Sequence, residues 1–138
     1  IINKSDNNLP NYETVASAGC DVRSTHGAHI GPGLSCLIKT GLYVEIPIGY
    51  EIQIRPRSGL ALKKQVTILN TPGTIDADYR GEIGVIIINH GLGPVSLGKG
   101  ERIAQLVLNK VEQIKWESVL ELSDTSRGDG GFGSTGKK

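Results

Sequence analysis

The sequence predicts an all-β fold, a sandwich, jelly roll or barrel, with at most one short helix and a flexible glycine-rich C-terminal arm. Apolar and β-branched runs recur about every 8–12 residues with turn residues between them, as in such folds. The 138 residues include 19 glycines and 6 prolines but only one Phe and one Trp. Many turns and few bulky anchors suit short strands better than long helices.

Length and charge limit the class of protein. A chain of 138 residues predicts one domain with a single sizeable core. It has 15 basic and 14 acidic residues, so no strong net charge favours nucleic acid or a membrane as a partner. No apolar run reaches the roughly 18 residues of a spanning helix, and Cys20 and Cys36 are too few for a disulfide scaffold. We therefore expect a cytoplasmic protein with reduced thiols.

Strands are expected throughout the first half of the chain. Residues 1–14 are polar and predict one strand followed by a loop. Tyr50–Arg55 alternates with period two, which is the pattern of a half-buried strand. Between these segments, short strands are expected over residues 36–39 and 42–46.

The middle of the chain predicts one helix and a pair of strands. Ser58–Lys64 lacks β-branched residues and forms the one short helix expected. Residues 66–69 and 82–89 predict two strands, joined by a link longer than a bare turn requires. Within the second strand, residues 85–88 are apolar on both faces, which predicts burial on both sides, in the core or at a subunit contact.

The character of the chain changes after residue 122. Residues 103–108 predict another apolar strand, and strand-like alternation returns over residues 114–122. Residues 123–138 contain repeated glycines and almost no apolar side chain, so they cannot bury enough surface to stay folded alone. We therefore expect a β domain over residues 1–122 and a mobile arm over residues 123–138.

The link between the two middle strands carries the strongest local signal of function. It holds Asp76, Asp78, Tyr79 and Arg80 within five positions, and loops on rigid scaffolds often carry function. For an Asp-x-Asp pair alone, a solvated hairpin tip is the plain alternative. Two carboxylates this close repel each other, which predicts that Asp78 turns away and pairs with an arginine.

Two other segments have side chains suited to phosphate. Arg57, Ser58 and Gly59 stand where the helix is expected to begin, and guanidinium forks and free backbone N–H groups bind phosphate oxygens. Ser58 serves equally well as a helix cap. The arm combines glycines and hydroxyls with Arg127 for phosphate and Phe132 for stacking, although a disordered tail is the alternative.

Three further features carry weaker signals. Gln105 stands among apolar residues, so its amide is either satisfied by backbone or faces a ligand. His26 and His29 have the spacing of metal ligands, but no third ligand stands near them. Residues 131–137 fit part of a phosphate-loop pattern by accident, because Lys138 replaces the final hydroxyl residue.

Together these segments resemble the five ordered motifs of the homotrimeric dUTP pyrophosphatases, the dUTPases, over residues 18–136. The resemblance implies a jelly-roll-like β-barrel or sandwich that assembles as a homotrimer with shared active sites. It also implies Mg²⁺-assisted hydrolysis of dUTP to dUMP and pyrophosphate, with water attacking the α-phosphate. That activity keeps uracil out of DNA and supplies dUMP for thymidylate synthesis.

The resemblance also implies a role for each motif residue. Asp21 would hold Mg²⁺ through water, Asp76 would activate the attacking water, and Tyr79 would pack on the sugar. The residues expected at the phosphates are Arg57, Ser58, Gly59 and Gln105. Those along the uracil and deoxyribose are Asn70, Gly73, Thr74, Ile75 and Asp76. From the arm of a neighbouring subunit, Phe132 would cover the uracil. The remaining substrate contacts of that arm are Arg127, Gly133, Ser134 and Thr135.

The chain departs from the family pattern at three positions outside this chemistry. Val22 stands where Leu is usual, a mild exchange. Gln65 differs from many relatives, which puts the backbone after Lys64 in question. Gly84 replaces a basic residue of some relatives, so any side-chain contact there is lost.

Two other functions remain as alternatives. A dCTP deaminase has a similar fold and would release ammonia from dCTP, although the Tyr79 link and the glycine-rich arm favour hydrolysis. A non-catalytic trimeric β module would bind a nucleotide or a protein partner without turnover.

Overall fold

The computed structural model describes residues 1–134 and consists mainly of short strands. The one helix of this range is too short and too polar to span a membrane. In chain order the elements are β1 (Ile2–Asn3), β2 (Cys20–Arg23), β3 (Ala28–Ile30), β4 (Ser35–Lys39), β5 (Leu42–Tyr43), β6 (Tyr50–Arg55), α1 (Ser58–Lys64), β7 (Val66–Ile68), β8 (Gly73–Ile75), β9 (Gly84–Asn89), β10 (Val95–Leu97) and β11 (Arg102–Lys110).

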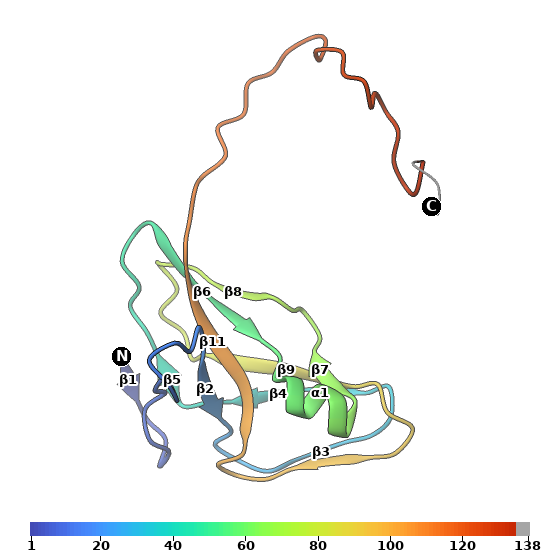
Figure 1. Cartoon of the computed structure of the whole chain (residues 1–138). Helices are drawn as coiled ribbons and strands as arrows, with labels where there is room; N and C mark the ends of the chain where they lie inside the picture. The colour runs from blue at the N-terminus through green and yellow to red at the C-terminus, as the bar shows by residue number, and fades with distance from the viewer. Residues whose placement is uncertain (135–138) are drawn as a thin grey trace.

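Two antiparallel sheets share one core (Figure 1). The larger sheet has the strand order β2–β11–β6–β8, and the smaller has β4–β9–β7. The pairs β1–β5 and β3–β10 complete the body. Ile54 and Leu106 of the larger sheet and Ile38 and Ile87 of the smaller sheet belong to a single buried cluster. The predicted all-β class is therefore confirmed, in the form of a sandwich.

The β9 strand has one core face and one half-buried face, so this chain alone does not bury both sides of the strand. Val85 and Ile87 are buried, whereas Ile86 and Ile88 are half-buried. Leu37, opposite Ile86 on β4, is 57% exposed. The physical reason is that only one layer of this chain covers the strand. The half-buried face is the one left for a subunit contact, the other location predicted.

The link between β7 and β9 crosses from one sheet to the other. Strands β7 and β9 pair as predicted, with Ile68 opposite Ile87. Between them, β8 leaves this sheet and pairs with β6, so that Gly73 lies opposite Ile54. Ile83, just before β9, is fully buried. The link is therefore fixed to the sandwich at both ends, as a functional loop on a rigid scaffold should be.

Helix α1 has the predicted bounds, but Ser58 does not cap it. Arg57 occupies the N-cap position, and no side chain caps the first turn. Leu60 is the buried residue that holds the helix on the sandwich. Gln65 ends the helix in the left-handed region, with φ of 53°, so the backbone turns sharply after Lys64.

Two expected strands are shortened or absent. Strand β5 covers only Leu42–Tyr43 and pairs with β1. No strand forms over residues 114–122, where the alternation predicted one, and residues 111–129 are all exposed. A strand needs a neighbour for its hydrogen bonds, and this segment extends away from the body after β11 (Figure 1).

Candidate active site

Three strands of the larger sheet bring polar residues together from distant parts of the sequence. Across β2 and β11, Asp21 lies opposite Gln105, and across β11 and β6, Gln105 lies opposite Arg55. The Cβ atoms of residues directly opposite each other in antiparallel strands are about 5 Å apart. Arg57 follows β6 by two positions, so the register places it at the same edge as Asp21.

The Asp21 carboxylate lies between two arginines. Its Oδ1 accepts a hydrogen bond from Arg57 Nε at 2.8 Å, and its Oδ2 lies 3.2 Å from Arg102 Nη1. Arg102 Nη1 also lies 3.1 Å from Glu13 Oε1. The side chains of Asp21 and Arg57 are 19% and 25% exposed, so these half-buried charges compensate each other.

Sequence reasoning missed Arg102 as a member of this cluster. The residue stands three positions before Gln105, in a segment that was singled out only for its amide. Besides its ion pairs, its backbone carbonyl accepts a hydrogen bond from Arg57 Nη1 at 3.3 Å. The only sequence signal was a charged residue at the start of an apolar strand, and that position alone does not reveal a partner.

Gln105 is satisfied by backbone, one of the two alternatives left open by the sequence. Its Nε2 donates to the Pro56 carbonyl at 2.9 Å, which fixes the turn that leads to Arg57. A Cβ at Gly19 would lie 2.5 Å from Gln105 Oε1, so the glycine leaves room for the amide. Through this hydrogen bond, Gln105 supports the backbone of the turn that carries Arg57, the turn predicted to bind phosphate.

The turn itself is open to a ligand. Ser58 and Gly59 are exposed at the first positions of α1. A Cβ at Gly59 would meet no atom within 4 Å, so the space above it is clear. Backbone N–H groups at the first turn of a helix have no partner within the helix. Together with Arg57, the turn offers donors to an anion.

The loop after β8 places Asp76 and Tyr79 on one turn. The Tyr79 backbone N–H donates to the Asp76 carbonyl at 3.1 Å. The Tyr79 hydroxyl donates to the Glu82 carbonyl at 3.0 Å. Both Asp76 and Tyr79 are exposed. On the β7 side, the side chain of Asn70 lies beside Gly73, 3.3 Å from where a Cβ would stand.

Within residues 1–134 Asp78 forms no ion pair with an arginine, contrary to the prediction. The nearby arginine, Arg80, lies 3.8 Å from Glu45 instead, and it donates to the Ala77 carbonyl at 2.7 Å. Exposure of Asp78 explains the difference, because a solvated carboxylate needs no ion pair to compensate it.

The two halves of the predicted site lie at opposite ends of the β6–β8 pair. The strands are antiparallel, with Ile75 opposite Ile52, so Asp76 follows β8 near the start of β6. Arg57 comes after the other end of β6. From Ile52 to Arg57 the chain rises about 16 Å in extended conformation. Within one copy of the chain, the Asp76 half of the predicted site therefore lies apart from the Asp21–Arg57 half.

The described part of the arm approaches neither half (Figure 1). Arg127 Nε donates to the Gly130 carbonyl at 2.7 Å, and Phe132 is fully exposed. Gly133 and Ser134 close a turn at the end of the described chain, and both are exposed. Thr135 lies outside the described residues.

A magnesium ion fits the donor set around Asp21 only with water and substrate as further ligands. Within residues 1–134 no three His, Cys, Asp or Glu side chains gather that could hold a metal. Mg²⁺ commonly keeps several waters and takes one or two carboxylates plus phosphate oxygens. The lone Asp21 carboxylate matches that mode. The rings of His26 and His29 bond instead to Thr25 Oγ1 and Ser96 Oγ, at 3.0 and 2.9 Å.

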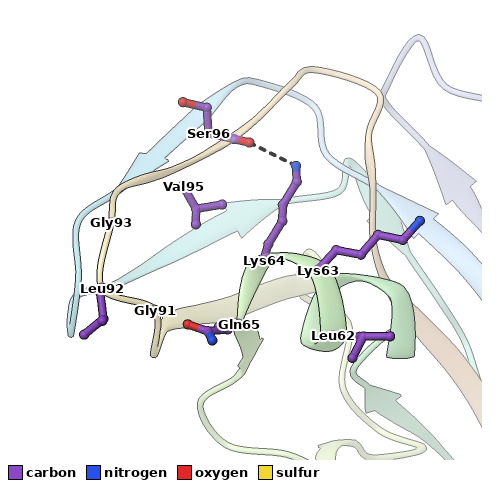
Figure 2. A pocket seen from close by; sticks show the side chains of 9 residues that line it. All are labelled: Leu62, Lys63, Lys64, Gln65, Gly91, Leu92, Gly93, Val95 and Ser96. Atoms are coloured by element: carbon purple, nitrogen blue, oxygen red, sulfur yellow. Dashed lines mark hydrogen bonds between the residues drawn. The ribbon is translucent and has the colours of Figure 1, made fainter.

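A hollow of about 320 Å³ lies elsewhere, between the end of α1 and β10 (Figure 2). None of the predicted site residues lines it. One of its two lysines, Lys64, donates to the Ser96 carbonyl at 3.2 Å and to Glu101 Oε1 at 2.8 Å. The charge of Lys64 is therefore already compensated by Glu101.

Comparison with known proteins gives one consistent result. The dUTPase family model matches residues 5–136. The deoxyuridine 5'-triphosphate nucleotidohydrolase of Crocosphaera subtropica is 56% identical over 128 residues, covering 93% of this chain and 90% of that protein. Its counterpart from Clostridium tetani is 54% identical over 134 residues, covering 97% and 92%.

Solved structures agree with the sequence relatives. The dUTPase of Staphylococcus bacteriophage 80alpha, solved with dUPNHPP, superposes with a TM-score of 0.85 at 31% identity over 94% of this chain and 92% of that one. A mutant dUTPase from phage phi11 of S. aureus, which coordinates a structural Mg(II) ion, gives 0.78 at 25% identity over 85% and 92%. These likenesses confirm the predicted jelly-roll-like fold. The match to the family model over nearly the whole length, and relatives above half identity, show that the chain belongs to the dUTPase family.

Proposed function

We propose that the protein hydrolyses dUTP to dUMP and pyrophosphate in active sites shared between three copies of the chain. Family membership supports the reaction. The observation that carries the shared site is the separation of Asp76 from Asp21 and Arg57 along the β6–β8 pair. A second copy brings the missing half to each site, and a third supplies an arm. Such an activity keeps uracil out of DNA and supplies dUMP for thymidylate synthesis.

The phosphate end of the site is built by Arg57, Ser58 and Gly59. Their guanidinium, hydroxyl and backbone N–H groups act as donors to the triphosphate oxygens. Arg57 is held by Asp21 at 2.8 Å and by the Arg102 carbonyl at 3.3 Å, so its fork is oriented before substrate arrives. Gln105 fixes the turn through the Pro56 carbonyl. Preorganised donors of this kind need little rearrangement during reaction.

Asp21 is the residue proposed to hold Mg²⁺ through water. When bound, the ion would neutralise triphosphate charge and help orient the phosphates for displacement. The Asp21 oxygen that faces Arg57 stays bonded to its guanidinium at 2.8 Å, so the same carboxylate would hold the arginine and the hydrated ion together. Arg102, bonded to the other oxygen at 3.2 Å, keeps the carboxylate in place meanwhile.

Asp76 is proposed to orient and activate the attacking water. Its side chain is exposed and forms no ion pair within residues 1–134, so its oxygens are free to accept a proton from water. The water oxygen bonds to the α-phosphorus, the bond from that phosphorus to the bridging oxygen breaks, and pyrophosphate leaves. The water proton passes to the carboxylate. Base assistance of this kind contributes about 10²–10⁴-fold to the rate.

The nucleoside is proposed to lie along the link, against Asn70 and the edge from Gly73 through Thr74 and Ile75 to Asp76. Backbone groups and one amide there distinguish uracil from cytosine, since a mismatched buried polar group costs about 1–3 kcal/mol. A filled site rejects the thymine methyl by overpacking. Tyr79 packs on the sugar.

The arm is proposed to close over the substrate. Phe132 would stack on the uracil, and Arg127, Gly133, Ser134 and Thr135 would contact the substrate phosphates. Phe132 is fully exposed in this chain, which supports the proposal that its ring packs against another copy of the chain. Closure excludes water and opening releases product.

The test is pyrophosphate release from dUTP, dTTP, dCTP and UTP with Mg²⁺, using the wild type, Asp76→Asn and Asp78→Asn. Both aspartates are exposed on the same loop, so Asp78→Asn is a matched control. We expect turnover of dUTP alone, a loss of about 10²-fold or more in Asp76→Asn, and little change in Asp78→Asn.

Other outcomes select other functions. Ammonia release from dCTP would identify a deaminase, and tight dUTP binding without turnover would identify a binding module. Equal losses of dUTP turnover in Asp76→Asn and Asp78→Asn would mean that Asp76 is not the residue that activates the water. Analytical ultracentrifugation at several protein concentrations tests the trimer separately.

A further inference from the structure

One glycine in the loop after β8 lies directly beneath the tyrosine ring. A Cβ at Gly81 would lie 2.5 Å from Tyr79 Cζ and 2.9 Å from Tyr79 Cε2. Real side chains almost never approach this closely, so any substitution at Gly81 must displace the ring. Gly81 is not among the described residues with φ in the left-handed region. The demand for glycine is therefore one of space for the ring.

The hydroxyl end of the ring, which is the part nearest to that Cβ position, is also tied to the sandwich. The Tyr79 hydroxyl donates to the Glu82 carbonyl at 3.0 Å. Glu82 is itself held by its carboxylate, whose Oε1 accepts from the Gly41 backbone N–H at 2.9 Å and whose Oε2 lies 3.5 Å from Lys39 Nζ. The hydroxyl end of the ring thus lies on Gly81 and is hydrogen-bonded to the Glu82 carbonyl.

The rest of the ring remains free to contact a ligand. Tyr79 is 43% exposed although the ring lies against Gly81. Its backbone N–H donates to the Asp76 carbonyl, so the ring and the Asp76 carboxylate belong to one turn. A wall fixed relative to the attacking group can discriminate between sugars, because steric selection depends on tenths of an ångström in a packed site.

We infer that Gly81 is a positioning residue that sets sugar selectivity by seating the Tyr79 ring against the deoxyribose. The inference rests on the proposed hydrolysis of dUTP with Tyr79 at the sugar. With Gly81 in place, the ring leaves no clearance for a 2′-hydroxyl. A side chain at position 81 displaces the ring and breaks its bond to Glu82. Productive binding of dUTP is then impaired and the barrier to UTP is lowered.

The test compares Gly81→Ala, Tyr79→Phe and a matched control, Gly93→Ala, by kcat/KM for dUTP and for UTP with Mg²⁺. Gly93 is suitable because a Cβ there would meet nothing within 4 Å and its φ is not in the left-handed region. In Gly81→Ala we expect the dUTP/UTP ratio of kcat/KM to fall roughly 10- to 100-fold. Tyr79→Phe keeps the ring but loses its anchor, so we expect a fall of roughly 2- to 10-fold. Gly93→Ala leaves the ratio unchanged.

Thermal midpoints separate this role from a purely structural one. A structural glycine would lower the midpoint and reduce both activities in parallel, leaving the ratio intact. An unchanged ratio in folded Gly81→Ala overturns the inference, as does an equal fall in Gly93→Ala. If Gly81→Ala does not fold, an unchanged ratio in Tyr79→Phe overturns it instead. A wild type that fails to hydrolyse dUTP overturns the proposed function and this inference with it.

Discussion

Apolar side chains are buried in the sandwich body and exposed in the segment after β11. In the body, Ile38, Ile83 and Val85 are fully buried. In the segment, Trp116 is 87% exposed and Leu120 is completely exposed. Burial of apolar surface contributes about 25 cal/mol per Å², so the body gains stability from this chain alone and the segment gains none. Within residues 1–134 no other part of the chain covers Trp116 or Leu120.

The comparison shows that an alternating pattern predicts a strand only where a neighbour is available. Tyr50–Arg55 and residues 114–122 both alternate. The first forms β6 because β11 and β8 pair with its two edges. The second has no partner strand in the described chain and stays extended and exposed. The difference lies in tertiary context, which periodicity does not contain.

Removal of the arm gives the sharpest test of this division. We expect truncation after Asp124 to leave the thermal midpoint of the body nearly unchanged, because the described residues beyond it contribute almost no buried surface. Activity with dUTP should fall about 10²–10³-fold, since the stacking and phosphate contacts proposed for the arm would be lost together. Circular dichroism melting and pyrophosphate release measure the two effects. A large fall in the midpoint, or retained activity, would contradict the separation of roles.

A pair of matched truncations tests the comparison by stability. Ile87→Ala and Leu120→Ala remove the same number of carbon atoms, one from a side chain that is 1% exposed and one from an exposed side chain. We expect Ile87→Ala to lower the free energy of unfolding by about 2–5 kcal/mol. Leu120→Ala should change the stability of the dissociated chain by less than about 0.5 kcal/mol. Urea denaturation at several protein concentrations distinguishes these effects from a change in association.

Some features were predictable from sequence because their causes are local. The bounds of α1 follow from a short run without β-branched residues between two strands. Pairing of β7 with β9 follows from two β-branched runs near each other in the chain. Crossing of the link through β8 was not predictable, because Gly73–Ile75 is three residues long and begins with a glycine.

The sequence singled out Asp21, Arg57 and Gln105, but it did not show the contacts that bring them together in the structure. Asp21 and Arg57 each carried a motif, but their 2.8 Å bond depends on the register of β2, β11 and β6. Arg102 joined them only through that register. The sequence does not show what the Gln105 amide contacts, and in the structure its Nε2 donates to the Pro56 carbonyl. Long-range geometry supplied what spacing lacks.

Arg102 allows the body half of the site to be tested without touching the arm. Arg102→Gln leaves Asp21 with one arginine partner, so both Asp21 and Arg57 become less well oriented. We expect kcat/KM for dUTP to fall about tenfold, because misplaced groups orient the phosphates poorly. Glu13→Gln is the control, since its side chain is 63% exposed at the outer edge of the cluster. A fall in Glu13→Gln as large as in Arg102→Gln would place the effect in the outer pair.

The smallest expected effect concerns pH and one ion pair of the body. Burial raises the pKa of Glu101, but the hydrogen bond and charge of Lys64, the Gly98 N–H and Arg57 together lower it below its ordinary value. The stabilisation from this pair is therefore present above the unfolded pKa and is lost as pH falls through the lower folded pKa. Because Glu101 is 31% exposed, we expect at most about 1 kcal/mol.

Thermal melting from pH 7 to pH 3 measures this contribution. Glu101→Gln should lower the midpoint at pH 7 and approach the wild type as pH decreases, because the wild-type carboxylate then loses its charge. Glu112→Gln, in the exposed segment, should follow the wild-type curve throughout, since that side chain forms no ion pair within residues 1–134. Parallel curves for the wild type and Glu101→Gln would mean that the Lys64 pair adds nothing to folding. If the Glu101→Gln curve lies below the wild type at pH 7 and meets it at low pH, while the Glu112→Gln curve follows the wild type throughout, the pH-dependent stability comes from the body.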